Sequence, residues 1–188
     1  MKKYIYILIL FLFTSQSQSQ TSHYKNLSKI EMEVFRNDEA IGYSNYFFEH
    51  KDNTMTIKNY TQFKVKLLGI NIFSISSEGI EKYENNKLVF FKSITFQNNK
   101  EKFVNLKYDN ESNKFIINGS SFKGKAEIDN VIGNWWNQKI LIANSQISPL
   151  SGSIKEQKVN FLKKEIIELY GKSYEVLHFK LRSKNENL

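Results

Sequence analysis

Residues 55–67, MTIKNYTQFKVKL, give the clearest indication of fold class in this 188-residue chain. Apolar or small side chains occupy every second position, from Met55 and Ile57 to Phe63, Val65 and Leu67, and polar side chains including three lysines alternate with them. A period of two residues is typical of a β-strand with one buried face and one wet face. Antiparallel sheets commonly have this division between faces, so the stretch predicts a strand of an antiparallel sheet.

The same alternation continues on both sides of this stretch. Ile30, Met32 and Val34 alternate with other residues near the N-terminus, and Leu177, Phe179 and Leu181 do so near the C-terminus. Asparagine, aspartate and glycine, which tolerate the positive φ of tight hairpin turns, separate the apolar runs. These predicted turns lie at 37–38, 85–86, 98–99, 109–113, 118–119 and 171–172. We therefore predict an all-β domain of at least eight strands that begins near Leu27, folded as a strongly curved antiparallel sheet or an open β-barrel.

Two regions depart from clean alternation. Residues 129–149, DNVIGNWWNQKILIANSQISP, predict a short helical turn and a loop around Trp135 and Trp136. Residues 155–170, KEQKVNFLKKEIIELY, fit a helix through the spacing of their apolar residues. We favour strands here, because Gly171 and the alternating segment after it indicate a hairpin.

The N-terminal segment has the layout of a secretory signal peptide. Lys2 and Lys3 precede an apolar run of ten residues, 4–13, and a polar stretch follows at 14–20. Ten apolar residues are too few to span a bilayer, which needs about 20. The predicted organisation is a signal peptide at 1–19, a flexible mature N-terminus at 20–26, a single β domain at 27–182 and a polar tail at 183–188. A secreted chain without cysteine is typical of the bacterial periplasm, which is the predicted location.

Composition excludes several classes of function. The chain carries 27 Lys and Arg against 19 Asp and Glu, a net charge of +8, but Arg36 and Arg182 are its only arginines. Base and phosphate recognition favours the guanidinium fork, so nucleic acid is not an expected partner. The absence of cysteine excludes disulfides, thiolate metal sites and cysteine nucleophiles. No nucleophile, phosphate-loop or histidine metal motif is present, so we expect no enzyme activity, no cofactor and no metal.

The adjacent tryptophans are the most distinctive local feature. Trp135 and Trp136 either cap the core or line the mouth of an apolar cavity, since indoles favour places with one apolar and one wet side. We expect the segment around them to fold over one open end of the sheet, with at least one indole facing the apolar interior. Together with Phe63, Val65 and Leu67 on the inner face, they form the predicted ligand-binding set.

Several short motifs, taken in order, resemble a family of secreted bacterial proteins described only as a domain of unknown function. They are Ala40-Ile41-Gly42-Tyr43, residues 63–69, Ile72-Phe73, Glu81-Lys82-Tyr83, Lys87-Leu88, residues 134–137, Gln146 and Leu150-Ser151-Gly152. The resemblance spans about residues 30–182 and implies a curved sheet comparable to periplasmic lipoprotein carriers and other lipid-binding β-folds. It implies no catalytic residues. The family usually has one further strand, so the strand at 174–182 is expected to be a sheet edge, whether through truncation or divergence.

Two functions follow from these expectations. The first is a non-catalytic, secreted protein that binds or carries an apolar, lipid-like molecule in the concavity of the sheet. The second is a structural or assembly factor of the cell envelope that acts through contacts with other proteins, using a sheet edge or an aromatic surface.

Overall fold

The computed structural model describes residue 24 and residues 26–183. The predicted signal peptide, most of the predicted flexible N-terminus and residues 184–188 lie outside the described residues. Twelve strands and a short 3-10 helix make up this part of the chain: β1 (Lys29–Arg36), β2 (Glu39–Lys51), β3 (Thr54–Leu67), β4 (Ile70–Glu84), β5 (Lys87–Gln97), β6 (Lys100–Asp109), β7 (Lys114–Gly119), β8 (Lys123–Glu127), β9 (Val131–Ile132), η2 (Gln138–Leu141), β10 (Ser145–Ile147), β11 (Ile154–Leu169) and β12 (Lys172–Ser183). None of the helices in this part is long and apolar enough to cross a membrane.

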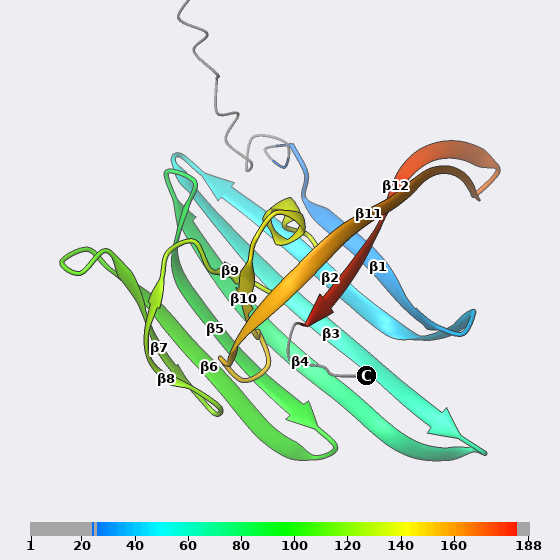
Figure 1. Ribbon diagram of the computed structural model, residues 1–188, viewed down its shortest axis with the longest axis horizontal. Coiled ribbons are helices and arrows are strands. Elements are labelled where there is room, and N and C mark those ends of the chain that lie inside the picture. The colour runs from blue at the N-terminus through cyan, green and yellow to red at the C-terminus, as the bar shows by residue number, and fades with distance from the viewer. Residues whose placement is uncertain (1–23, 25, 184–188) are drawn as a thin grey trace, which may run out of the picture.

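Strands β1 to β8 form one antiparallel sheet in which each strand pairs with the next along the chain. The sheet remains open, with β1 and β8 at its two edges, and it curves around the segment that carries β9, η2 and β10 (Figure 1). The predicted all-β fold, a curved sheet with one short helical segment beside Trp135 and Trp136, is confirmed.

The hairpin turns follow the chemistry expected from the sequence. The two-residue turns Asn37-Asp38, Asn85-Asn86 and Asn98-Asn99 have φ between 48° and 66° at all six residues. A two-residue turn of this kind needs positive φ at both positions, which asparagine and aspartate tolerate better than most residues. The Asn98-Asn99 turn sets the register of the β5–β6 hairpin, in which Gln97 lies opposite Lys100 and Ser93 opposite Val104.

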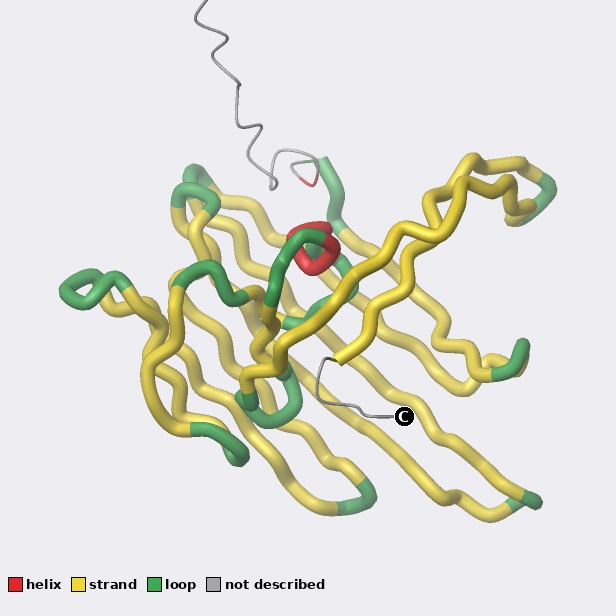
Figure 2. The backbone as a smooth tube through the Cα atoms, in the orientation of Figure 1, coloured by secondary structure: helices red, strands yellow, loops and turns green. Residues whose placement is uncertain are grey.

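The second sheet has the order β12-β11-β10-β9 and is formed by chain that follows the large sheet. Strands β11 and β12 pair over most of their length, which confirms the strand prediction for 155–170 and the hairpin after it. Strand β12 has no second partner among the described strands and is a sheet edge, as expected. Figure 2 shows how this hairpin crosses the molecule and projects beyond the remainder of the second sheet.

The hydrophobic core lies between the inner face of the large sheet and the covering segment, residues 128–153. The sheet contributes large side chains such as Tyr46, Ile57 and Phe91, and the covering segment contributes Trp136 and Ile147. The two layers are also joined by polar contacts: the hydroxyl of Ser93 donates to the backbone oxygen of Pro149 at 2.5 Å. The meander therefore supplies most of the core, and the covering segment completes it.

Candidate functional site

A buried carboxylate joins the covering segment to the large sheet. Glu81 projects from β4 into the core and is 1% exposed. Its Oε2 accepts a hydrogen bond from the Tyr83 hydroxyl at 2.7 Å, and its Oε1 accepts from Trp136 Nε1 at 2.9 Å and from Asn134 Nδ2. Two of the three donors belong to the covering segment, so Glu81 fixes that segment on the sheet.

The environment of Glu81 favours its neutral form. Burial raises the pKa of its carboxyl above the usual value, and the hydrogen bonds from Trp136, Tyr83 and Asn134 offset only part of this effect. None of the ion pairs in the described part of the chain involves Glu81. The burial and the nearby Glu81 carboxylate also raise the pKa of the Tyr83 hydroxyl well above its usual value.

The two adjacent tryptophans have different environments. Trp136 is 3% exposed and packs edge-on against Tyr24, Phe48 and Tyr83, with ring centroids 5.2 to 5.7 Å away. The Tyr24 hydroxyl donates to the Trp136 backbone oxygen at 2.6 Å. Trp135 is 64% exposed. The expectation that at least one indole faces the apolar interior is confirmed by Trp136.

A pocket of about 330 Å³ opens where the covering segment meets one end of the sheet. We call it the mouth pocket; it is lined by Tyr83, Asn85, Asn86, Lys87, Leu88, Phe115, Ile128, Asn130, Val131, Ile132, Asn137 and Lys139. Leu88, Phe115 and Ile132 are buried and provide an apolar wall. Asparagines and two lysines provide the polar part of the lining. Apolar walls with a few polar groups are typical of small-molecule sites.

Local structure explains how the covering segment holds its side of the mouth pocket. Asn137 caps η2 by accepting a hydrogen bond from the Lys139 backbone N–H at 3.0 Å. Asn130 is buried; its Nδ2 donates to the Glu127 backbone oxygen, and its Oδ1 accepts from the Ser145 hydroxyl at 2.7 Å. Gln157 Nε2 donates to the backbone oxygens of Ile140 and Ala143, which closes the loop behind η2. The pocket wall is thus held by buried polar side chains.

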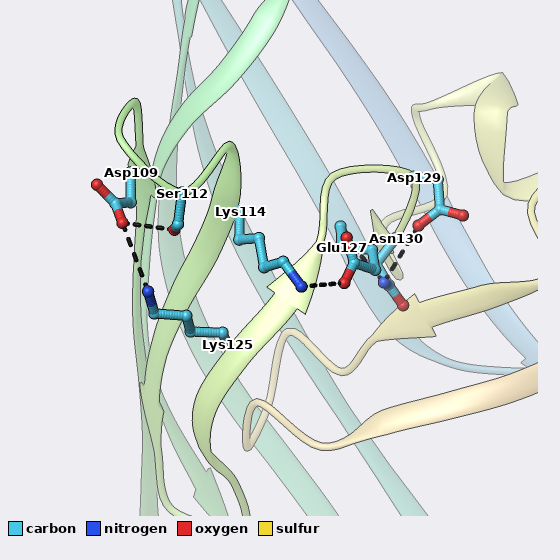
Figure 3. Close-up of polar contacts among 7 residues, drawn as sticks. All are labelled: Asp109, Ser112, Lys114, Lys125, Glu127, Asp129 and Asn130. Carbon is cyan, nitrogen blue, oxygen red and sulfur yellow. Dashed lines mark hydrogen bonds and ion pairs between the residues drawn. The ribbon is translucent and has the colours of Figure 1, made fainter.

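Acidic side chains near this end of the sheet are paired with lysines (Figure 3). Lys114 Nζ lies 2.5 Å from Glu127 Oε1, and Lys125 Nζ lies 3.8 Å from Asp109 Oδ2. The hydroxyl of Ser112 donates to Asp109, and this bond is the main reason why the pKa of Asp109 is lowered. Within the described ranges, no group of His, Asp or Glu is arranged to hold a metal ion.

The structure separates the five residues of the predicted ligand-binding set. Phe63, Val65 and Leu67 lie on the inner side of β3, but toward the end of the strand remote from Trp136. Ile57 of the core and Val65 are eight residues apart, which corresponds to about 26 Å along a strand. Phe63 and Val65 are half-buried, Leu67 is exposed, and Phe63 contacts Phe73 of β4 with ring centroids 6.0 Å apart. Their role in binding a ligand stays a prediction.

Hydroxyl side chains separate the core from this apolar end of the sheet. The hydroxyls of Ser44 and Thr61 are 2.7 Å apart, as are those of Ser77 and Thr95. Asn59 Nδ2 donates to the backbone oxygen of Asn45 at 3.2 Å. The inner face therefore contains two apolar regions with a hydrogen-bonded band between them, and the mouth pocket adjoins the core region.

Sequence reasoning missed Glu81 and most of the mouth pocket. Glu81 occupies an inward position of β4, but its partners Asn134 and Trp136 are more than 50 residues away along the chain. The available signal was the pair of asparagines, Asn134 and Asn137, that flank the tryptophans. Both are buried, and a buried amide needs hydrogen-bond partners.

These features define an all-β protein built on an open, curved sheet with a small pocket at the end covered by a tryptophan-bearing segment. The chain belongs to the family described as a domain of unknown function, DUF6134, whose family model matches residues 32–188. Comparison with curated proteins gave no match, and comparison with solved structures gave none.

Proposed function

We propose that the protein is a secreted, non-catalytic binder or carrier of an apolar, lipid-like molecule, and that the mouth pocket holds this molecule. The observation that carries the proposal is the pocket itself, about 330 Å³ between the sheet and the covering segment. Ligand pockets begin at roughly 300 Å³ and are lined mainly by apolar side chains with a few polar groups that orient the ligand.

The distribution of side chains around the pocket supports an amphiphile. Leu88, Phe115 and Ile132 would contact a hydrocarbon chain, and Lys87 and Lys139 offer cations to a polar head group. The Lys87 ammonium lies 4.8 Å from the centre of the Tyr108 ring, which orients it without neutralising its charge. A single alkyl chain with a small polar head fits this combination.

Ile128 is the most exposed of the apolar residues that line the mouth pocket, so its substitution should cost the fold little. It follows β8, lines the mouth pocket and is 41% exposed. We expect Ile128→Asp to weaken binding of a medium-chain fatty acid about tenfold, because it replaces an apolar contact by a charge and about 1.4 kcal/mol corresponds to a factor of ten. Isothermal titration calorimetry with decanoate and with neutral decanol measures the effect.

Ile116→Asp is the matched control. Ile116 lies on β7, is 45% exposed and is absent from the pocket lining. It should bind both probes as the wild type does. If neither probe binds the wild-type protein while the fold remains intact, the carrier proposal is wrong and the assembly role becomes the better explanation. Equal loss in both variants would place the ligand elsewhere.

A further inference from the structure

Two hairpin tips expose apolar side chains to solvent. At the β3–β4 tip, Leu67, Leu68 and Ile70 are exposed, and Leu68 is 95% exposed. At the β11–β12 tip, Leu169 and Tyr170 are exposed, and Tyr170 completely so. We call these the apolar tips. Exposed apolar residues are ordinary when scattered, but contiguous ones indicate a binding surface.

The turn residues of the apolar tips differ from those of the other tight hairpins. Leu68 and Tyr170 have φ of 51° and 52°, the left-handed conformation. At the first position of three other two-residue turns the chain has Asn37, Asn85 and Asn98, with φ between 48° and 50°. Asparagine adopts this conformation far more readily than leucine or tyrosine. The apolar tips thus carry bulky side chains where turn chemistry favours a small polar one.

Charge at the β3–β4 tip is entirely positive. Lys64 and Lys66 immediately precede it, and residues 53–77 contain no aspartate or glutamate. On the β11–β12 hairpin, Glu165 and Glu175 are each paired with a lysine, at 2.5 and 2.9 Å respectively, and at the tip itself one acidic residue, Glu168, is balanced in charge by Lys172. A cationic, apolar tip is complementary to an anionic lipid surface, where lysine contacts head groups and apolar side chains enter the interface.

The apolar side chains of the β11–β12 hairpin occupy both of its faces. The cross-strand pairs place Leu177 and Ile166 on one face and Tyr174 and Leu169 on the other, and all four are exposed. A protein partner docks against one face of a strand pair, whereas a lipid interface surrounds the tip. The arrangement therefore favours lipid over a second protein.

Both apolar tips project from the same side of the molecule. Figure 1 shows the β3–β4 and β11–β12 tips at the right-hand end of the long axis, with the β1–β2 turn between them. The β4–β5 turn lies at the opposite end of the strands. A flat surface at right angles to the long axis can touch both apolar tips together.

We propose that the two apolar tips bind the protein to an anionic membrane surface. The inference is independent of the mouth pocket. A probe placed in the tips tests it directly, because the chain contains no cysteine and single cysteines can be introduced for labelling. The variants are Leu68→Cys and Tyr170→Cys, with Asp52→Cys as control, since Asp52 has the same position in the β2–β3 turn, a φ of 50°, and no place in the lining of the mouth pocket.

Each variant is labelled with an environment-sensitive nitrobenzoxadiazole fluorophore and titrated with vesicles of phosphatidylglycerol and phosphatidylcholine. We expect emission to increase at least about twofold and shift to the blue at positions 68 and 170, and to stay unchanged at position 52. Because each fluorophore reports only on its own surroundings, the measurement separates membrane contact at the tips from binding by other parts of the full-length chain. Vesicles of phosphatidylcholine alone should give a smaller response, because they lack the anionic charge.

Two results would overturn the inference. The first is an unchanged spectrum at 68 and 170, or an equal change at 52, with an excess of phosphatidylglycerol vesicles. The second is a blue shift that appears on raising the protein concentration without vesicles, which would make a second copy of the chain the occupant. The double substitution Leu68→Asn with Tyr170→Asn gives an independent check, because asparagine suits the turn conformation at both positions. The probe for this check is attached at Leu169→Cys. The double substitution should reduce quenching of that probe by spin-labelled lipid about fivefold.

Discussion

Trp136→Ala should lower the free energy of unfolding by about 3–5 kcal/mol, the usual cost of removing a large buried aromatic side chain. Trp136 contacts three aromatic rings, and its indole N–H donates to Glu81. The substitution leaves a cavity and also removes one of the hydrogen bonds of a buried carboxylate. Since 1 kcal/mol corresponds to about 2–4 °C in a domain of this size, the melting temperature should fall by roughly 10 °C.

Trp135→Ala is the control for this prediction. The residue is the immediate neighbour and the same type, but its side chain is largely exposed, so its loss should change stability by no more than about 0.5 kcal/mol. Thermal and urea unfolding followed by far-UV circular dichroism compare the two variants. Equal destabilisation by both substitutions would show that the indole of Trp136 is not the contact that holds the covering segment.

Strand alternation and turn residues were sufficient to predict the meander. The pattern of residues 55–67 identified β3, and one Asn-Asp pair and two Asn-Asn pairs marked three of the turns of the meander. For residues 155–170 the apolar spacing fitted a helix, and the hairpin signal at Gly171 overrode it correctly. These features are local, and local physics determines them: side chains alternate along a strand, and few residues accept positive φ.

The location of the pocket could not be derived in the same way. Alternation places Phe63, Val65 and Leu67 on the inner face, but it does not show how far the covering segment extends along that face. In the structure the cover ends before these residues, so they lie away from Trp136. The burial of Glu81 could not be predicted either. The alternation pattern does not distinguish a buried glutamate from an exposed one unless its hydrogen-bond donors, which are distant in the sequence, are known.

Glu81→Ala should destabilise the protein by about 3 kcal/mol or more. The substitution leaves the Tyr83 hydroxyl, the Trp136 indole N–H and the Asn134 amide without their acceptor, and a buried polar group without a partner costs about 1–3 kcal/mol. Glu81→Gln keeps the shape and an oxygen acceptor for two of these donors. Its amide N–H can donate to the Tyr83 oxygen, which reverses the bond that the Tyr83 hydroxyl donates to Glu81, so this variant should lose much less stability than Glu81→Ala at neutral pH.

The wild-type protein and the Glu81→Gln variant together test the raised pKa of Glu81. Because the carboxyl is harder to ionise in the folded than in the unfolded chain, it contributes stability that is fully present below its unfolded value of 4.5 and is lost as pH rises through the folded pKa. Asp109 and Glu165, whose pKa values are lowered, have the opposite dependence and titrate in both proteins. The difference in unfolding free energy, wild type minus Glu81→Gln, isolates Glu81 and should fall as pH rises above about 4.5. A constant difference would show that folding leaves the pKa of Glu81 unchanged, and a rise with pH would show that the folded protein prefers Glu81 ionised; either result would contradict the prediction.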